Sequence, residues 1–198
     1  MSRRVLVALA CAVLIGAHSA HSAHAANGWW TFERRTNLNS TLSWKWTYPP
    51  SPTQYARSWR AGSGSSQNEC RRAEGWLPAG WYSQWGHWDH YDGSAINGRV
   101  WWLQDKYCSD GVTKRTELFI HSEETASNGQ YCTSAYDDPT CWEREADYYS
   151  LGCVKLARPS PVAGFPNDLG SAHSVYHNYG GSGQHGAFTD SFELYVFS

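Results

Sequence analysis

Cys153 is the residue of this chain whose type and context most clearly suggest chemistry. It lies in the stretch S-L-G-C-V-K-L, residues 150–156. A thiol attacks as the thiolate, and an ordinary cysteine, with a pKa of about 8.5, is mostly protonated at neutral pH. A cysteine nucleophile therefore needs a base beside it, and we expect His121 to be that base. Backbone N–H groups of Gly152 and Cys153 are the candidates for an oxyanion hole.

The N-terminal residues predict export from the cytoplasm. Residues 1–25 contain Arg3 and Arg4, an apolar run and the triplet A-H-A at 23–25, which is the pattern of a cleaved signal peptide. We expect residues 26–198 to form the secreted, extracytoplasmic protein, in the cell wall or periplasm. No other apolar run is long enough to span a bilayer, and the net formal charge of −2 gives no attraction to nucleic acid. The expectation is a monomer without membrane insertion or a nucleic-acid partner.

The remaining cysteines indicate which thiol stays free. With the signal peptide removed, their number is odd in an oxidising compartment. Cys132 and Cys141 lie in a polar, turn-rich segment that a local bridge can close, and Cys70 would then pair with Cys108. This choice leaves Cys153 unbridged, although sequence alone does not fix the pairing. The alternative role for Cys153 is a buried, inert thiol.

Two histidine pairs raise the question of a metal. His87 and His90 lie in G-H-W-D-H-Y-D-G, and His173 and His177 lie at i and i+4 of a predicted helix. Neither pair has the cysteine or acidic partners at the spacing of a strong zinc motif. We interpret the first pair as part of a polar turn and the second as a surface pair. The expectation is that the protein uses no metal and no other cofactor.

Strands must position these residues, because β signals dominate the chain. T-L-S-W-K-W-T-Y, residues 41–48, alternates with Leu42, Trp44, Trp46 and Tyr48 on one face. Further strands are predicted over 99–105, 115–121 and 192–197, and a single helix over 167–178, capped by Asn167 or Asp168. The prediction is one mainly β domain, a sandwich or barrel, with one short helix and a disulfide-bearing insertion.

Three motifs in order along the chain resemble those of the L,D-transpeptidase catalytic (YkuD-type) domain family. S-L-G-C-V-K-L resembles the family signature S/T-x-G-C-[IV]-[RK]-[LM], and F-I-H-S, residues 119–122, resembles its upstream I-H-[GS] element. G-W-L-P-A-G-W-Y, residues 75–82, is similar to a stretch that precedes the catalytic part. The resemblance covers roughly residues 59–156. It departs at Leu151, where many members have histidine, and in the longer interval from His121 to Cys153, which the Cys132–Cys141 loop would account for.

The resemblance implies peptidoglycan stem peptides as substrate and partner. Cys153 would attack the carbonyl before the terminal D-alanine of a tetrapeptide stem and hold the stem as a thioester. His121 would accept the thiol proton, with Ser122 or Ser150 as its orienting group. Three further residues are implied candidates for substrate contact: Lys155, where the family usually has arginine, Tyr149 and Trp81.

Two alternatives stay open. In a papain-like or NlpC/P60-type cysteine peptidase, the base follows the nucleophile, and His185 would replace His121. Pro159 and Pro161 argue against the helix that such a peptidase begins at its cysteine. The second alternative is a noncatalytic module that binds cell wall or carbohydrate, since 12 Trp and 12 Tyr suit stacking on sugars.

Overall fold

The computed structural model describes residues 27–48, 50–129, 148–156, 167–179 and 193–198. Three of the predictions made from the sequence concern residues outside these ranges. The signal peptide, the Cys132–Cys141 bridge and His185 lie outside the described residues.

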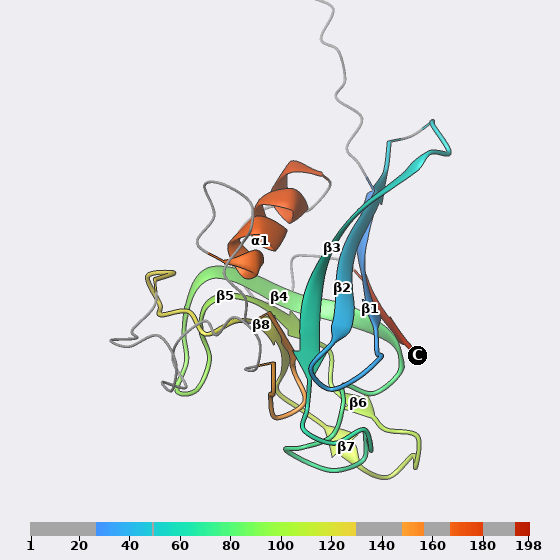
Figure 1. Ribbon diagram of the computed structural model, residues 1–198, viewed down its shortest axis with the longest axis vertical. Coiled ribbons are helices and arrows are strands. Elements are labelled where there is room, and N and C mark those ends of the chain that lie inside the picture. Colours follow the sequence, from blue (N-terminus) through green and yellow to red (C-terminus); the bar gives the residue numbers. More distant parts are fainter. Residues whose placement is uncertain (1–26, 49, 130–147, 157–166, 180–192) are drawn as a thin grey trace, which may run out of the picture.

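Strands are the main secondary structure of the described residues, and one helix accompanies them (Figure 1). The mainly β class predicted from the sequence is therefore confirmed. The elements in chain order are β1 (Asn27–Glu33), β2 (Ser40–Thr47), β3 (Gln54–Ser63), β4 (Gly80–Asp92), β5 (Asn97–Leu103), β6 (Lys106–Tyr107), β7 (Lys114–Arg115), β8 (Leu118–His121), β9 (Val154–Lys155), α1 (Asp168–Asn178) and β10 (Glu193–Phe197).

The larger sheet closes on itself as a barrel. Its strands follow one another in the order β1-β10-β4-β5-β8-β9-β3-β2, and β2 pairs again with β1. Two of these pairings, β1 with β10 and β8 with β9, are parallel, and the others are antiparallel. The two-stranded β6–β7 sheet lies at the other end of the molecule from α1 (Figure 1). Closure leaves these barrel strands without an open edge.

Alternation in the sequence located the strands well where one face is apolar. The prediction over 41–48 is confirmed by β2, in which Leu42, Trp44 and Trp46 are buried. The prediction over 192–197 is likewise confirmed by β10, and β5 begins two residues before its predicted start.

The strand predicted over 115–121 is wrong in its first half. Arg115 belongs to β7 in the small sheet, and Glu117 has a φ of 55°, which an extended strand does not contain. The barrel strand β8 therefore begins only at Leu118. A turn before Leu118 interrupts the predicted strand, and the alternation of side chains in the sequence does not reveal that turn.

Helix α1 begins where the sequence predicted. The side chain of Asn167 caps it by accepting a hydrogen bond of 2.6 Å from the N–H of Gly170. Leu169, Ala172 and Tyr176 face the barrel core, and α1 packs against β2, β3 and β5. Among the described residues, no helix has the length and apolar character needed to cross a membrane.

Tryptophan rings fill the core between α1 and the barrel strands. Trp30 is 1% exposed, and its ring centroid lies 4.9 Å from that of Trp44 and 5.2 Å from that of Trp101. Tyr176 of α1 stacks on Trp30 with an interplanar angle of 6°. Such edge-to-face and stacked pairs add to the stabilisation from burial alone.

A disulfide joins the segment after β3 to the hairpin between β6 and β7. Cys70 and Cys108 are bonded, with their Cα atoms 5.3 Å apart, as the sequence predicted. The neighbouring Glu69 carboxylate pairs with Arg34 at 2.6 Å and accepts from the backbone N–H of Ser109 at 2.9 Å. The segment that precedes β4 is thus held to the barrel at two adjacent residues.

The core arrangement yields a stability prediction with a matched control. Trp30→Ala should lower the free energy of unfolding by about 3–5 kcal/mol, because it removes a fully enclosed indole from the core. Trp29 lies on the same strand but is half-buried, so Trp29→Ala should lower the free energy of unfolding clearly less. Urea denaturation followed by far-UV circular dichroism measures both. Equal losses would contradict this description of the core.

Candidate functional site

The pairing of β8 with β9 brings the two predicted catalytic residues together. Ile120 pairs with Val154 and His121 with Lys155, in a parallel register. His121 follows Phe119 on the same face of its strand, about 6.6 Å further along. Phe119, His121 and Cys153 all line one cavity of about 950 Å³. Residues separated by a long stretch of sequence therefore line one cavity, and the action of His121 as the base for Cys153 stays a prediction.

This cavity gathers most of the predicted site residues. Its lining contains six of them: His121, Ser122, Tyr149, Ser150, Cys153 and Lys155. Tyr149 is 49% exposed and stands at the opening. Trp81 does not belong to the group, because it lies 53% exposed on β4, with its ring against Tyr195, and lines a separate hollow.

The thiol of Cys153 is buried and protonated. The residue is 5% exposed, and Sγ donates a hydrogen bond of 3.5 Å to the carbonyl of Glu117. Burial raises the pKa of this thiol to about 11, although the backbone of Phe119 and the charge of Arg115 both favour the thiolate. At neutral pH the thiol therefore needs a base to become nucleophilic.

The orientation of His121 suits it to that task. Its Nδ1 lies 3.1 Å from the backbone carbonyl of Ser122. A carbonyl can only accept, so Nδ1 carries the proton and the lone pair of the neutral imidazole is on Nε2. The orienting group is thus the main chain of Ser122, since the Ser122 hydroxyl donates instead to the carbonyl of Leu156.

Ser150 fixes the turn that carries Cys153 and does not orient His121. Its hydroxyl donates to the carbonyl of Cys153 at 2.6 Å and accepts from the N–H groups of Gly64 at 3.0 Å and Gly152 at 3.2 Å. This contact also affects the expected oxyanion hole. Because the N–H of Gly152 donates to Ser150, only the N–H of Cys153 remains as a candidate of the two predicted donors.

Arg115 supports the same turn, and no pattern in the sequence indicates this role. The residue is 3% exposed, and its guanidinium donates to the carbonyl of Leu151 at 3.1 Å. It also reaches three carbonyls of the segment held by the disulfide, those of Glu69, Gly75 and Trp76. Arg115 lies in a polar stretch of the sequence, but in the fold its buried guanidinium connects this segment to the turn that carries Cys153.

Lys155 is already paired. Its ammonium lies 2.5 Å from Oε1 of Glu123, and both side chains are largely buried in the cavity wall. The predicted contact between Lys155 and a substrate carboxylate would have to displace this ion pair. Glu124 next to it pairs with Arg99 at 2.6 Å and accepts from Asn167 at 2.8 Å, which ties the wall to the cap of α1.

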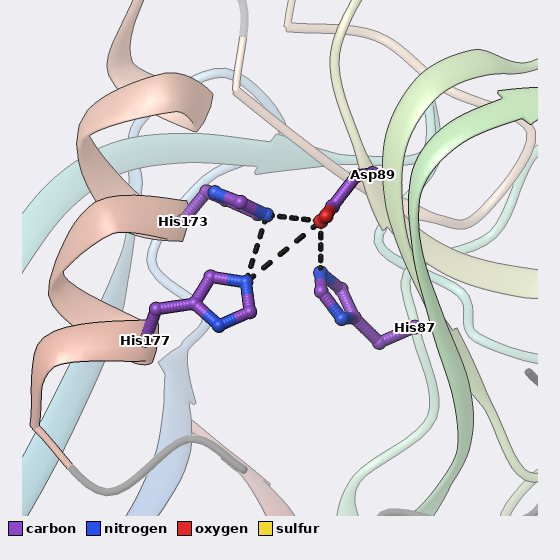
Figure 2. Close-up of side chains that lie close together, drawn as sticks. All are labelled: His87, Asp89, His173 and His177. Carbon is purple, nitrogen blue, oxygen red and sulfur yellow. Dashed lines mark hydrogen bonds and ion pairs between the residues drawn. The ribbon is translucent and has the colours of Figure 1, made fainter. Parts of the chain in front are cut away.

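A second cluster of side chains lies outside this cavity, where the sequence analysis expected a polar turn and a surface pair. His87, Asp89, His173 and His177 point toward one another from β4 and α1 (Figure 2). Both interpretations are wrong: His87 is fully buried in a strand, and the helical pair faces Asp89. His90 is exposed and contacts the carbonyl of Ala126 instead.

Electrostatics in this cluster follow from the contacts. The hydrogen bond from His173 holds the pKa of the Asp89 carboxyl well below its usual range. Burial in turn lowers the pKa of His173. The carboxylate therefore stays ionised, and the three imidazoles surround an anion.

Comparison of the chain with known protein families, with curated proteins and with solved structures gives no match. The chemistry must therefore be inferred from the two groups of side chains themselves. The cavity contains a thiol and an imidazole, and the second cluster contains nitrogen and oxygen donors.

The Cys153 turn yields a prediction about Gly152. Its φ is 116°, and a Cβ there would lie 1.9 Å from Nη2 of Arg115. Gly111 has a φ of 68° but no atom within 4 Å of such a Cβ, which makes it a matched control. Gly111→Ala should cost about 1–2 kcal/mol of stability. Gly152→Ala should cost more, because its φ lies outside the left-handed helical region and because Arg115 must also move. Equal shifts of Tm would contradict the role given to Arg115.

The buried thiol yields a prediction about pH. Alkylation of Cys153 by iodoacetamide should accelerate about tenfold per pH unit from about pH 7 to 10, because the thiolate fraction rises throughout that range below a raised pKa. Peptide mass spectrometry that quantifies alkylated Cys153 measures the rate, with free cysteine as the control. An alkylation rate that stops rising below about pH 9, as for an ordinary thiol, would show that burial does not raise the pKa of Cys153.

Proposed function

We propose that the protein is a secreted cysteine acyltransferase of the L,D-transpeptidase type that acts on peptidoglycan stem peptides. The observation that carries this proposal is that Cys153 and His121 line the same cavity, with the Nδ1 proton of His121 directed to the Ser122 carbonyl and the imidazole lone pair on Nε2. The three motifs that resemble the family support the choice of substrate. The extracytoplasmic location rests on the signal-peptide pattern, and the Cys70–Cys108 disulfide is compatible with it.

In the first half of the reaction, the thiol becomes a thioester. The proton on Sγ of Cys153 moves to Nε2 of His121 while sulfur attacks the carbonyl carbon that precedes the terminal D-alanine. The carbon–nitrogen bond then breaks, and the departing amine takes the proton from His121. The stem remains bound to Cys153 and D-alanine leaves.

In the second half, an acceptor removes the stem. His121 takes a proton from the incoming group, which attacks the thioester carbonyl, and the carbon–sulfur bond breaks. The thiolate recovers the proton from His121. A side-chain amine of a neighbouring stem gives a cross-link, a free D-amino acid gives exchange, and water gives an L,D-carboxypeptidase.

The size and charge of the cavity suit a peptide. Its volume of about 950 Å³ is at the upper end of what small-ligand sites occupy. Exposed Arg72 lines its rim, whereas Lys155 is already paired with Glu123. Arg72 is therefore the better candidate to orient a stem carboxylate, because a guanidinium can bind it through two parallel hydrogen bonds.

A noncatalytic cell-wall-binding module is the second candidate, and two observations favour it. The Cys153 thiol is 5% exposed with a raised pKa, as expected for an inert cysteine. Trp81 and Tyr195 are exposed with their ring centroids 4.6 Å apart, which suits stacking on a sugar.

Mass spectrometry of purified tetrapeptide muropeptides, incubated with the protein, distinguishes the two candidates. The enzyme should release D-alanine and form dimers, exchange products or tripeptides. Cys153→Ala should abolish this turnover, and His121→Ala should slow it by about 10²–10⁴-fold. His90→Ala, which removes an exposed histidine outside the cavity, should leave the rate unchanged.

The opposite outcome is equally informative. If the folded wild-type protein releases no D-alanine yet sediments with insoluble peptidoglycan, the acyltransferase proposal is wrong. Loss of that sedimentation in Trp81→Ala or Tyr195→Ala would then identify the binding module. Retention in both variants would exclude the aromatic pair as its binding surface.

A further inference from the structure

Three imidazole rings and one carboxylate converge between β4 and α1. Nε2 of His87, His173 and His177 lie 3.3, 2.5 and 3.8 Å from Oδ1 of Asp89 (Figure 2). The Nε2 atoms of His173 and His177 are 3.0 Å apart. These four donor atoms, one from each residue, lie within 4.8 Å of one another. Such a group is unusually compact for side chains from two different elements.

Hydrogen bonding alone does not account well for this arrangement. Nε2 of an imidazole either donates one hydrogen bond or accepts one in the plane of the ring. Nε2 of His173 is nevertheless within hydrogen-bond distance of both Asp89 and His177. A cation among the donor atoms would be bound by all four at once.

We propose that His87, Asp89, His173 and His177 bind one Zn²⁺ ion. Zinc accepts imidazole nitrogen at about 2.0–2.1 Å and carboxylate oxygen at similar distances, so tetrahedral ligands lie about 3.4 Å from one another. The separations of 2.5 to 3.8 Å from Asp89 bracket that spacing, and every pair of donor atoms lies within 4.8 Å, so small rotations of the side chains suffice. Three nitrogens and one oxygen also suit zinc better than calcium or magnesium, which prefer oxygen ligands.

The site is built to hold the ion in place. His87 is fully buried and stacks on Trp101 of the core, while the side chains of Asp89, His173 and His177 are 19, 17 and 27% exposed. Four protein ligands complete a tetrahedron, which is the pattern of structural zinc sites. The ion would thus fasten α1 to the barrel wall.

The zinc site is separate from the proposed acyl transfer. None of the four ligands lines the cavity that contains Cys153. The inference therefore does not depend on the proposed function and replaces the expectation from the sequence that the protein binds no metal.

The test is titration of the chelator-treated, purified protein with Zn²⁺ and, separately, with Co²⁺. We expect one Zn²⁺ per chain by calorimetry, a higher Tm with Zn²⁺ than with EDTA, and an intense visible spectrum typical of tetrahedral Co²⁺. His173→Gln and Asp89→Asn should each weaken Zn²⁺ binding by more than about 100-fold, because loss of even an outer-shell partner costs about 10–100-fold.

His90→Ala is the matched control, since it removes an exposed histidine next to Asp89 on the same strand. It should bind Zn²⁺ and Co²⁺ as the wild type does. Circular dichroism without metal identifies any variant that fails to fold, and the wild-type titration stands regardless of the variants. No saturable binding by the folded wild type, or equal weakening in His90→Ala and His173→Gln, would overturn the proposal.

Discussion

Closure of the barrel depends on a strand of only two residues. Val154 and Lys155 pair with β8 on one side and with Gly62 and Ser63 of β3 on the other. Without them, two strands of the sheet would expose unpaired backbone groups, which is costly for a soluble domain. Because Cys153 directly precedes this strand, the register that closes the barrel also fixes the thiol beside the β8 residues. The architecture and the candidate site therefore rest on one constraint.

The turn before β9 is held by hydrogen bonds of two side chains, the half-buried Ser150 and the buried Arg115. The Ser150 hydroxyl bonds within the turn and to Gly64, and the Arg115 guanidinium reaches Leu151. Buried polar groups of this kind rigidify a structure when their partners are complete. The same enclosure desolvates the Cys153 thiol and raises its pKa, so the rigidity of the turn and the protonated state of the thiol have one cause.

Helix α1 contributes to the histidine cluster and contacts the cavity wall through its cap residue. Asn167 caps the helix and also donates to Glu124 in the cavity wall, while His173 and His177 further along meet Asp89 of β4. An ion bound at the cluster would therefore stabilise the helix whose first turn supports the cavity. The two sites share no residue, but both depend on α1.

The sequence by itself determined the features that depend on local patterns. Alternation identified β2 and β10, the cap residue identified the start of α1, and the S-L-G-C and F-I-H-S motifs singled out two residues that line one cavity, Cys153 and His121. Tertiary structure alone decided features whose partners are distant in the chain. Asp89 lies close to His87 in the sequence, but it is 84 positions from His173, so the sequence did not show that the helical pair meets this carboxylate, and Arg115 meets its carbonyl acceptors only after folding. Side-chain periodicity reports which face is apolar, but it carries no information about which distant polar groups will converge.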